Sequence, residues 1–284
     1  MDLFVDVLLD ALIDNIKILP FLFLTFLLME YLEDKMQDKT KHLLKKAGKS
    51  GPVWGSLLGV VPQCGFSAAS SNLYAGKVIS MGTLIAVYLS TSDEMLPIMI
   101  SEAYNPLMII EILLIKIGIG IIAGLSIDFA YRNILKKQER EVDIHHFCEH
   151  EHCECGHGIL KPAIKHTVKI FSFLLIVSII LGLLIELFGL ESVSGSVLSS
   201  TFVGPLIAGL IGLIPNCAAS VVITELFIEG AIGFGTMLSG LLVGAGVGIL
   251  VLIRVNDDTK NNLTIISLLY IIGVVCGFIF NLFM

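Results

Sequence analysis

The sequence predicts an all-α polytopic membrane protein built from two inverted repeats, each with three transmembrane helices and one re-entrant helical hairpin. Three observations predict this fold class. The chain of 284 residues is 55% hydrophobic and 15% charged, which leaves too little polar surface for a soluble domain of this length. Six apolar stretches reach the length of about 20 residues that a helix needs to cross a bilayer. Landmarks of the first half of the chain also recur in the second half.

The apolar stretches follow one another along the chain, and the charged residues gather in the loops between them. The formal charge of −7 therefore reflects a few loops and gives no sign of a nucleic-acid partner. The expected partner is the lipid bilayer, and a homo-oligomer is left open. The stretches cover residues 8–33, 78–100, 106–131, 167–190, 231–253 and 262–284.

The two halves of the chain match at an offset of 153 residues. Pro62 and Cys64 correspond to Pro215 and Cys217. A single offset that aligns several separated landmarks is hard to obtain by chance, so two repeats are predicted. The other matched residues are Gln63 with Asn216, Gly82-Thr83 with Gly235-Thr236, Gly124 with Gly277, and Asp128 with Asn281. The resulting units are repeat A (1–131), a His/Cys-rich linker (132–165) and repeat B (166–284).

Lysine and arginine gather in the loop 34–50 and in the linker, and the positive-inside rule places both in the cytoplasm. Both loops can face one side only if residues 51–75 dip into the membrane and return. Repeat A then has three crossings, so repeat B enters the membrane upside down. A broken helix that crosses fully would look similar locally, and that alternative stays open at the level of sequence.

The two Pro-amide-Cys triplets are predicted to be the tips of the two hairpins. Each arm has about ten residues, roughly half a bilayer, which brings both tips near the midplane. Paired helix breaks in inverted repeats point to a transporter's binding site. The alternative is a purely structural role, in which the prolines only kink two spans and the cysteines are small buried apolar residues. The candidate solute-binding residues are Pro62, Gln63, Cys64, Ser67, Pro215, Asn216 and Cys217.

Asp93 and Glu94 lie within the apolar stretch 78–100. Ionised carboxylates at membrane depth are expensive and usually line cavities or ion pathways. The alternative is that the pair is solvated at the outer end of the span. Ser92, with Ser90 and Thr91 beside it, could support an ion or bond back to helix carbonyls.

A lysine and a run of glycines also lie inside apolar stretches. The lysine is Lys116, which could neutralise Asp93 across helices. The small-xxx-small run of Gly240, Gly244 and Gly248 is most simply explained by close helix packing.

The linker contains "HHFCEHEHCECGHG", which indicates a mobile chelating tract. Imidazole and thiolate together suit zinc, cobalt, nickel, copper(I) or cadmium, and the tract could deliver or sense a metal. The alternative is a solvated polar loop of incidental composition. The candidate ligands are His145, His146, Cys148, His150, His152, Cys153, Cys155 and His157.

The motifs "PQCGFS" at 62–67, "GTLIA" at 82–86 and "STSDE" at 90–94, followed by Pro97, resemble a known family. They are similar to the ten-helix heavy-metal exporters, also labelled arsenic efflux proteins or manganese transporters and distantly similar to arsenic permeases. The resemblance covers essentially the whole chain. It implies a multi-pass protein of the cytoplasmic membrane that exports a metal or metalloid. Ten helices would agree with six crossings and four hairpin arms.

The leading functional hypothesis is therefore a secondary active efflux transporter for a heavy-metal ion or metalloid, with Asp93 and Glu94 binding the solute or the coupling proton. No Gly-x-x-x-x-Gly-Lys-Ser/Thr loop occurs, so ATP hydrolysis by this chain is not expected. No enzymatic activity and no tightly bound cofactor are expected either. One alternative is a membrane thiol–disulfide electron carrier using Cys64 and Cys217. Another is an anion or organic-acid transporter with hairpin helix N-termini facing the substrate.

Overall fold

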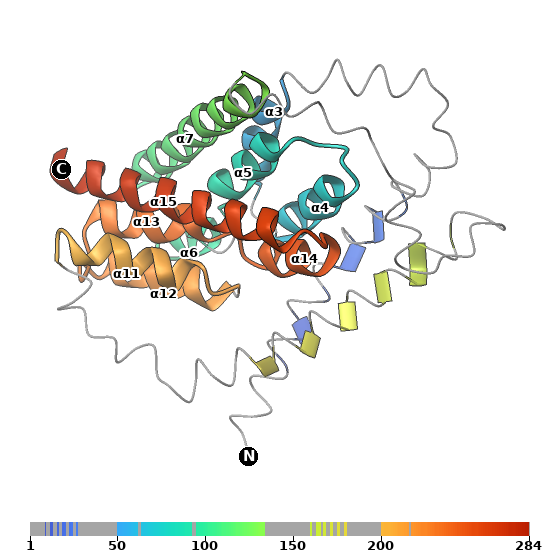
Figure 1. The fold of residues 1–284 in the computed structure, drawn as a ribbon. Helices are drawn as coiled ribbons and strands as arrows, with labels where there is room; N and C mark the ends of the chain where they lie inside the picture. Colours follow the sequence, from blue (N-terminus) through green and yellow to red (C-terminus); the bar gives the residue numbers. More distant parts are fainter. Residues whose placement is uncertain are drawn as a thin grey trace.

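The computed structural model describes five nearly continuous parts of the chain and a few isolated positions. These are residues 50–61, 64–92, 95–133, 200–215 and 217–283, with scattered positions between 9 and 27 and between 160 and 180. Every regular element within these residues is an α-helix, as Figure 1 shows. The prediction of an all-α protein is confirmed.

The helices with described bounds fall into two sets of five. The first set is α3 (Gly51–Gly59), α4 (Cys64–Ala75), α5 (Met81–Ser90), α6 (Met95–Ser101) and α7 (Pro106–Asn133). The second set is α11 (Val203–Gly212), α12 (Cys217–Ile228), α13 (Phe234–Val243), α14 (Gly248–Val255) and α15 (Thr259–Phe283). Four helices of the second set begin 153 positions after their counterparts in the first set. These pairs are α4 with α12, α5 with α13, α6 with α14, and α7 with α15. The offset read from the sequence therefore also aligns the helix starts.

Within the described residues, four segments are long and apolar enough to cross a membrane: Met81–Ser101, Pro106–Asn133, Phe234–Val255 and Thr259–Phe283. They match four of the six predicted stretches. The other two, 8–33 and 167–190, fall largely outside the described residues. The protein is therefore a helical membrane protein with several spans.

Two of these four spans are discontinuous, which the sequence interpretation did not anticipate. The first span consists of α5 and α6 with the interruption 91–94, called break A below. The other consists of α13 and α14 with the interruption 244–247, called break B. Within break B, Gly246 has a φ of +52°, a left-handed conformation that glycine adopts without a steric penalty. Hydropathy does not register break B, because glycine, alanine and valine are not polar.

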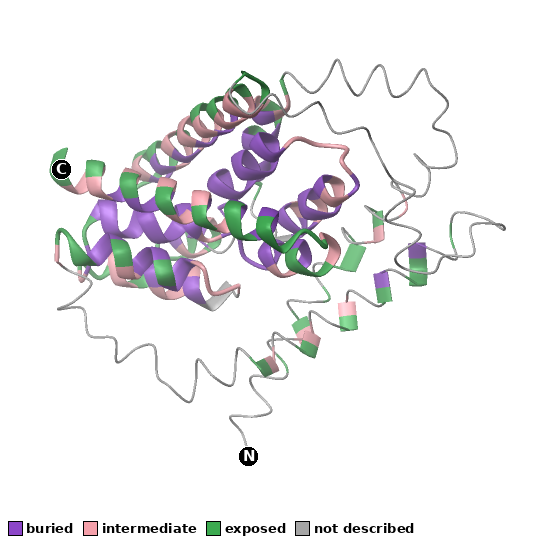
Figure 2. Ribbon diagram, in the orientation of Figure 1, coloured by how far each residue is buried: buried purple, intermediate pink, exposed green. Residues whose placement is uncertain are grey.

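The discontinuous spans form the centre of the bundle, and α7 and α15 lie outside them. Every residue of α5 and of α13 is buried, whereas α7 and α15 expose large apolar side chains such as Leu107, Ile122, Leu263 and Ile271. Figure 2 shows this contrast between the buried inner helices and the largely exposed outer ones. An apolar exposed face is the surface expected to contact lipid.

The two halves use the same close helix contact. A Cβ added at Gly82 would lie within 3.0 Å of the Gly124 carbonyl, and the same holds for Gly235 and Gly277. These contacts join α5 to α7 and α13 to α15. The matched polar residues lie at the same ends: Asp128 accepts from the Gly82 N–H at 2.9 Å, and Asn281 donates to Thr236 Oγ1 at 3.2 Å.

α3 and α4 form a helical hairpin. α3 runs parallel to α5, because Gly51 lies against Thr83 and Gly59 lies against Ser90. Only residues 76–80 separate α4 from the start of α5. The twelve residues of α4 span about 18 Å, so this short loop can reach α5 only if α4 turns back toward the end where α3 began. We call the bend between the arms, residues 60–63, tip A.

α11 and α12 repeat this arrangement. Ser239 donates to the Pro205 carbonyl at 2.7 Å, and a Cβ added at Gly244 would lie 3.9 Å from the Gly212 carbonyl, so α11 runs parallel to α13. Residues 229–233 join α12 to α13 and again require the second arm to return. The bend at residues 213–216 is called tip B.

Candidate functional site

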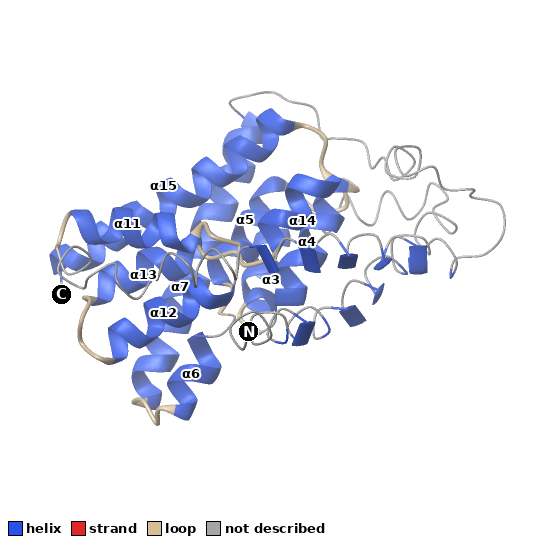
Figure 3. Cartoon of the chain, turned by 90° about the horizontal axis from the view of Figure 1, so that it is seen from below, coloured by secondary structure: helices blue, strands red, loops and turns tan. Residues whose placement is uncertain are grey.

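The second arm of each hairpin packs on a half-helix from the other half of the chain. α4 contacts α14, and α12 contacts α6. Figure 3 shows both pairs side by side. Because each second arm begins at a tip and each of these half-helices begins at a break, the crossed packing brings tips and breaks together.

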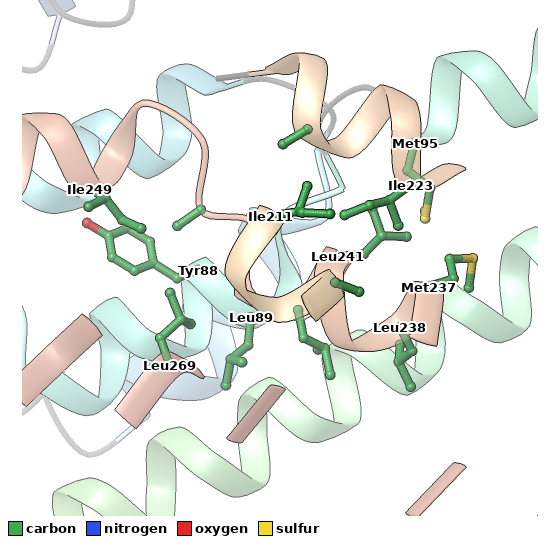
Figure 4. Packing of buried hydrophobic residues seen from close by; sticks show 14 of the residues in the cluster. Tyr88, Leu89, Met95, Ile211, Ile223, Met237, Leu238, Leu241, Ile249 and Leu269 are labelled. Atoms are coloured by element: carbon green, nitrogen blue, oxygen red, sulfur yellow. The ribbon is translucent and has the colours of Figure 1, made fainter. Parts of the chain in front are cut away.

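Tip A lies beside break B. A Cβ added at Gly248, the first residue of α14, would lie 2.8 Å from the Cβ of Ser67 on α4. The Ser71 hydroxyl lies 2.8 Å from the Gly248 carbonyl and 2.7 Å from the Tyr88 hydroxyl. The Tyr88 hydroxyl in turn lies 3.1 Å from the same carbonyl, and Figure 4 shows the ring extending toward Ile249 of α14. Hydroxyls from two helices, α4 and α5, therefore lie at the carbonyl of the first residue of α14, directly after break B.

Tip A also contacts break A. The buried Ser92 hydroxyl donates to the carbonyl of Val60, in the first position of tip A. Ser90 and Thr91 instead bond back to the Val87 carbonyl at 3.0 and 2.8 Å. Of the two roles considered for these hydroxyls, bonding to their own helix is the one observed for Ser90 and Thr91. Of the two described residues of break A, Ser92 is the one whose hydroxyl bonds to the hairpin.

Tip B and break B enclose a small cavity. Its volume is about 10 Å³, close to the smallest space that holds one water molecule. Hairpin residues line one side and residues of α13 and break B line the other. The lining residues are Gly212, Ile214, Ala219, Ser220, Gly240, Gly244 and Gly246. The glycines leave backbone atoms exposed to this space. The run at 240, 244 and 248 thus serves close packing, as predicted, and also forms part of the cavity wall and the contact with Ser67.

The predicted site residues divide into described and undescribed ones. Ser67 and Ser92 are buried at the contacts given above, and Pro215 is half-buried in tip B. Cys64 and Cys217 are the first residues of α4 and α12. Outside the described residues lie Pro62, Gln63, Asp93, Glu94, Asn216 and the eight His and Cys ligands of the linker. Within the described parts, no three His, Cys, Asp or Glu residues are grouped to hold a metal ion.

Sequence reasoning missed the roles of Tyr88, Ser71 and Gly248, and it missed the partner of Lys116. Lys116 is completely buried, and its Nζ donates to the Leu241 carbonyl on α13 at 2.7 Å. Ser71 could have been noticed, since it stands at helical spacing between Ser67, a predicted site residue, and Tyr74. No local signal in the sequence could have identified a backbone carbonyl 125 residues away as the partner of Lys116.

The buried discontinuous spans, the paired helical hairpins and the apolar outer helices define a multi-pass α-helical membrane protein. A family model described as "Putative, 10TM heavy-metal exporter" matches residues 1–193, which is more than half of the chain. The protein belongs to this family, as its motifs suggested. Comparison with curated proteins gave no match, and comparison with solved structures gave none either.

Proposed function

We propose that the protein is a secondary active efflux transporter that moves a heavy-metal ion or metalloid across the cytoplasmic membrane. Family membership supports heavy-metal export and favours transport over catalysis. The proposed solute site consists of tips A and B with breaks A and B, including Cys64, Cys217, Asp93 and Glu94. The main observation in favour of this proposal is that residues at and directly after break B lie next to both hairpins.

The argument for convergence uses two contacts. Ser67, which touches Gly248, is three residues beyond Cys64, about 4.5 Å along the helix. Ala219, which shares a cavity with Gly246, is two residues beyond Cys217. Residues 246–248 therefore lie near the starts of both α4 and α12. A solute held there would be within reach of both cysteines.

The inverted arrangement in the membrane is part of the proposal, and contacts at the two ends of the bundle support it. At one end, the Tyr74 hydroxyl donates to Asn261 at 2.7 Å, so the α13–α14 span ends near the place where α5 begins. At the other end, the rings of Tyr104 and Phe227 lie 5.9 Å apart, and those of Phe227 and Phe234 lie 6.1 Å apart. Tyr104 follows α6, and Phe234 begins α13, so the two discontinuous spans run in opposite directions.

The site residues have a chemistry suited to soft cations. Thiolate sulfur prefers soft metals, and metalloids bind thiols for the same reason. The first N–H groups of a helix favour a negative sulfur at its N-terminus, which is the form that binds a metal. Cys64 and Cys217 both begin helices. The carboxylates of Asp93 and Glu94 would neutralise a bound cation in the low-dielectric interior.

The discontinuous spans suggest how the solute could be exposed first to one side and then to the other. Each half-helix packs against a hairpin arm, so a hairpin can move together with one half-helix and relative to the other half. Such gating of one repeat against the other around a fixed central site is the usual mode of inverted-repeat transporters. A proton is the proposed coupling ion.

Accumulation of metals in cells tests the proposal. Cells that express the protein should contain less of at least one of Cd²⁺, Zn²⁺, Cu⁺, Mn²⁺ or arsenite than cells that lack it. Cys64→Ser and Cys217→Ser should each abolish the difference, because serine does not supply a soft ligand. Cys276→Ser is the matched control, since this half-buried thiol is on α15, outside the tips.

Undiminished export by both tip variants would remove the thiols from the mechanism. A Cys64–Cys217 disulfide that forms and breaks reversibly, with no effect of the protein on metal accumulation, would instead favour the electron-carrier alternative.

A further inference from the structure

Asn72 on α4 has a buried amide without a hydrogen-bond partner. The side chain is completely buried. Within the described part of the chain, its Oδ1 and Nδ2 are the buried side-chain atoms that no donor or acceptor reaches. An amide that leaves water without gaining a partner destabilises the fold. Native proteins keep few such groups, and each one calls for an explanation.

The rest of α4 is polar on its buried side and apolar where it is partly exposed. Such a helix resembles the membrane helices whose polar side chains face the interior of a bundle and mark the path of a solute. The buried polar residues are Ser67, Ser70, Ser71, Asn72 and Tyr74. The partly exposed residues are Phe66, Ala69, Leu73 and Ala75.

Asn72 lies between two contacts that α4 makes with the other half of the chain. One residue earlier, the Ser71 hydroxyl lies 2.8 Å from the Gly248 carbonyl, directly after break B. Two residues later, the Tyr74 hydroxyl donates to Asn261 Oδ1 at 2.7 Å, in the first turn of α15. The amide is about 12 Å along the helix from the start of α4 at tip A. It therefore stands on the stretch of α4 that leads from the proposed solute site to the end of the bundle where α14 ends and α15 begins.

The position that matches Asn72 at the offset of 153 is Glu225 on α12. Glu225 is exposed, whereas Asn72 is completely buried. Both second arms thus carry a strongly polar side chain at the same place in the repeat, covered in one half and uncovered in the other. This is the difference expected when two inverted repeats take opposite positions in a cycle of alternating access.

We propose that Asn72 binds the solute on its route between the hairpin tips and this end of the bundle, through the water or hydroxide groups that the solute carries. This inference rests on the proposed function. Oδ1 accepts a hydrogen bond from such a group and Nδ2 donates one, so both unpaired atoms gain a partner when the route is occupied. With α4 packed against α14, as in this structure, the route is closed at the level of Asn72.

An uncharged amide suits a residue that must release the solute again. Transport requires binding that is favourable enough for entry and weak enough for departure. A carboxylate here would hold a cation more strongly in the low-dielectric interior, and it would cost more to bury whenever the route closes. Sulfur is the stronger ligand for a soft cation, so the cysteines at the tips can take the solute over from the amide.

Exchange of Cd²⁺ by the purified full-length protein in proteoliposomes tests the contact with the solute. Asn72→Ala removes both hydrogen-bonding atoms without narrowing the route. The Cd²⁺ concentration for half-maximal exchange should then rise by roughly threefold to tenfold, the worth of one or two neutral hydrogen bonds. The maximal rate should change little, because the amide holds the solute only before it reaches the tips. Asn72→Thr, which has a similar size and one hydroxyl, should reverse part of the rise.

Thermal denaturation of the same proteins in detergent, without Cd²⁺, tests whether the amide is unpaired. Asn72→Ala should leave the melting temperature unchanged or raise it, because no hydrogen bond is lost and alanine favours the helix. Asn262→Ala is the matched control, since this buried side chain donates to the Asn256 carbonyl at 2.8 Å and accepts from Asn256 Nδ2 at 2.6 Å. The control should lower the melting temperature by about 2–4 °C and leave the half-maximal concentration unchanged.

Two results would overturn the role of Asn72 alone. An unchanged half-maximal concentration in Asn72→Ala would remove the amide from the route. A melting temperature that falls in Asn72→Ala as far as in Asn262→Ala would show that the amide has a structural partner, such as a bound water. Absence of Cd²⁺ exchange by the unchanged protein would instead contradict the proposed export of soft cations, and the role of Asn72 with it.

Discussion

Gly82 and Gly235 show how single residues define the packing of this protein. Each lies in the first turn of a central half-helix, and its Cα faces the backbone of the neighbouring outer helix, at Gly124 and Gly277. Any side chain at Gly82 or Gly235 would have to displace backbone atoms, which cannot move as a flexible side chain does. Close backbone contact is a main source of stability where lipid removes the hydrophobic advantage of burial.

Gly82→Ala is expected to destabilise the protein by about 1–3 kcal/mol, the usual cost of overpacking a tight contact. Gly118→Ala is the matched control, because this glycine is also in a long apolar helix but has no atom within 4 Å of the added Cβ. The control should be neutral or slightly stabilising, since alanine favours the helix. Thermal denaturation of the detergent-solubilised proteins measures both. Equal melting temperatures for the two variants would contradict the close contact.

At the residue scale, the features that occur in both halves of the chain could be predicted from the sequence, and the contacts that occur in only one half could not. The Pro-amide-Cys triplets stand out because they occur twice, and so do the matched glycines. The bond from Lys116 to Leu241 occurs once and joins a side chain to a backbone carbonyl, which leaves no pattern in the sequence. The pairing of Lys116 with Asp93 across helices stays a prediction, because Asp93 lies outside the described residues.

At the scale of elements, the hairpins were predictable and the broken spans were not. Proline, an amide and cysteine in apolar surroundings indicate a bend, and the arms of α3, α4, α11 and α12 have 9 to 12 residues, close to the expected ten. Break B contains glycine, alanine and valine, which a hydropathy average treats as neutral or apolar, and break A contains Asp93 and Glu94, whose charges the sequence interpretation assigned to a site and not to a helix break. The positions of both breaks depend on the hairpin arms that pack on α6 and α14, and that packing is long-range.

The His/Cys tract of the linker, residues 145–158, is the segment for which the sequence makes the clearest chemical prediction, and it lies outside the described residues. We propose that it faces the cytoplasm and binds metal before export. Deleting residues 145–158 should then raise the solute concentration needed for half-maximal export and leave the maximal rate largely unchanged. Transport rates measured over a range of metal concentrations check this. Complete loss of transport in a correctly folded deletion variant would instead assign the tract to the pathway.

At the scale of the whole molecule, the two halves have similar helix arrangements but differ in the charged side chains that they carry. The starts of four of the five helix pairs coincide at one offset, and the glycine contacts between inner and outer helices are the same. The acidic pair of break A corresponds to Gly246 and Val247, and Lys116 corresponds to Leu269. This difference is what a transporter needs, since a symmetric frame can open to either side while a single specialised site holds the solute.

The most direct test of the account is X-ray absorption spectroscopy of Cd²⁺ bound to a purified variant that lacks residues 145–158 and carries Cys276→Ser. Cys64 and Cys217 are then the only cysteines left in the chain. If the two hairpin tips meet around one solute, the protein will bind one Cd²⁺ with two sulfur ligands, and replacing either cysteine by serine will remove one of them. Cd²⁺ bound with no sulfur ligand, or two ions each with a single sulfur, would contradict the account.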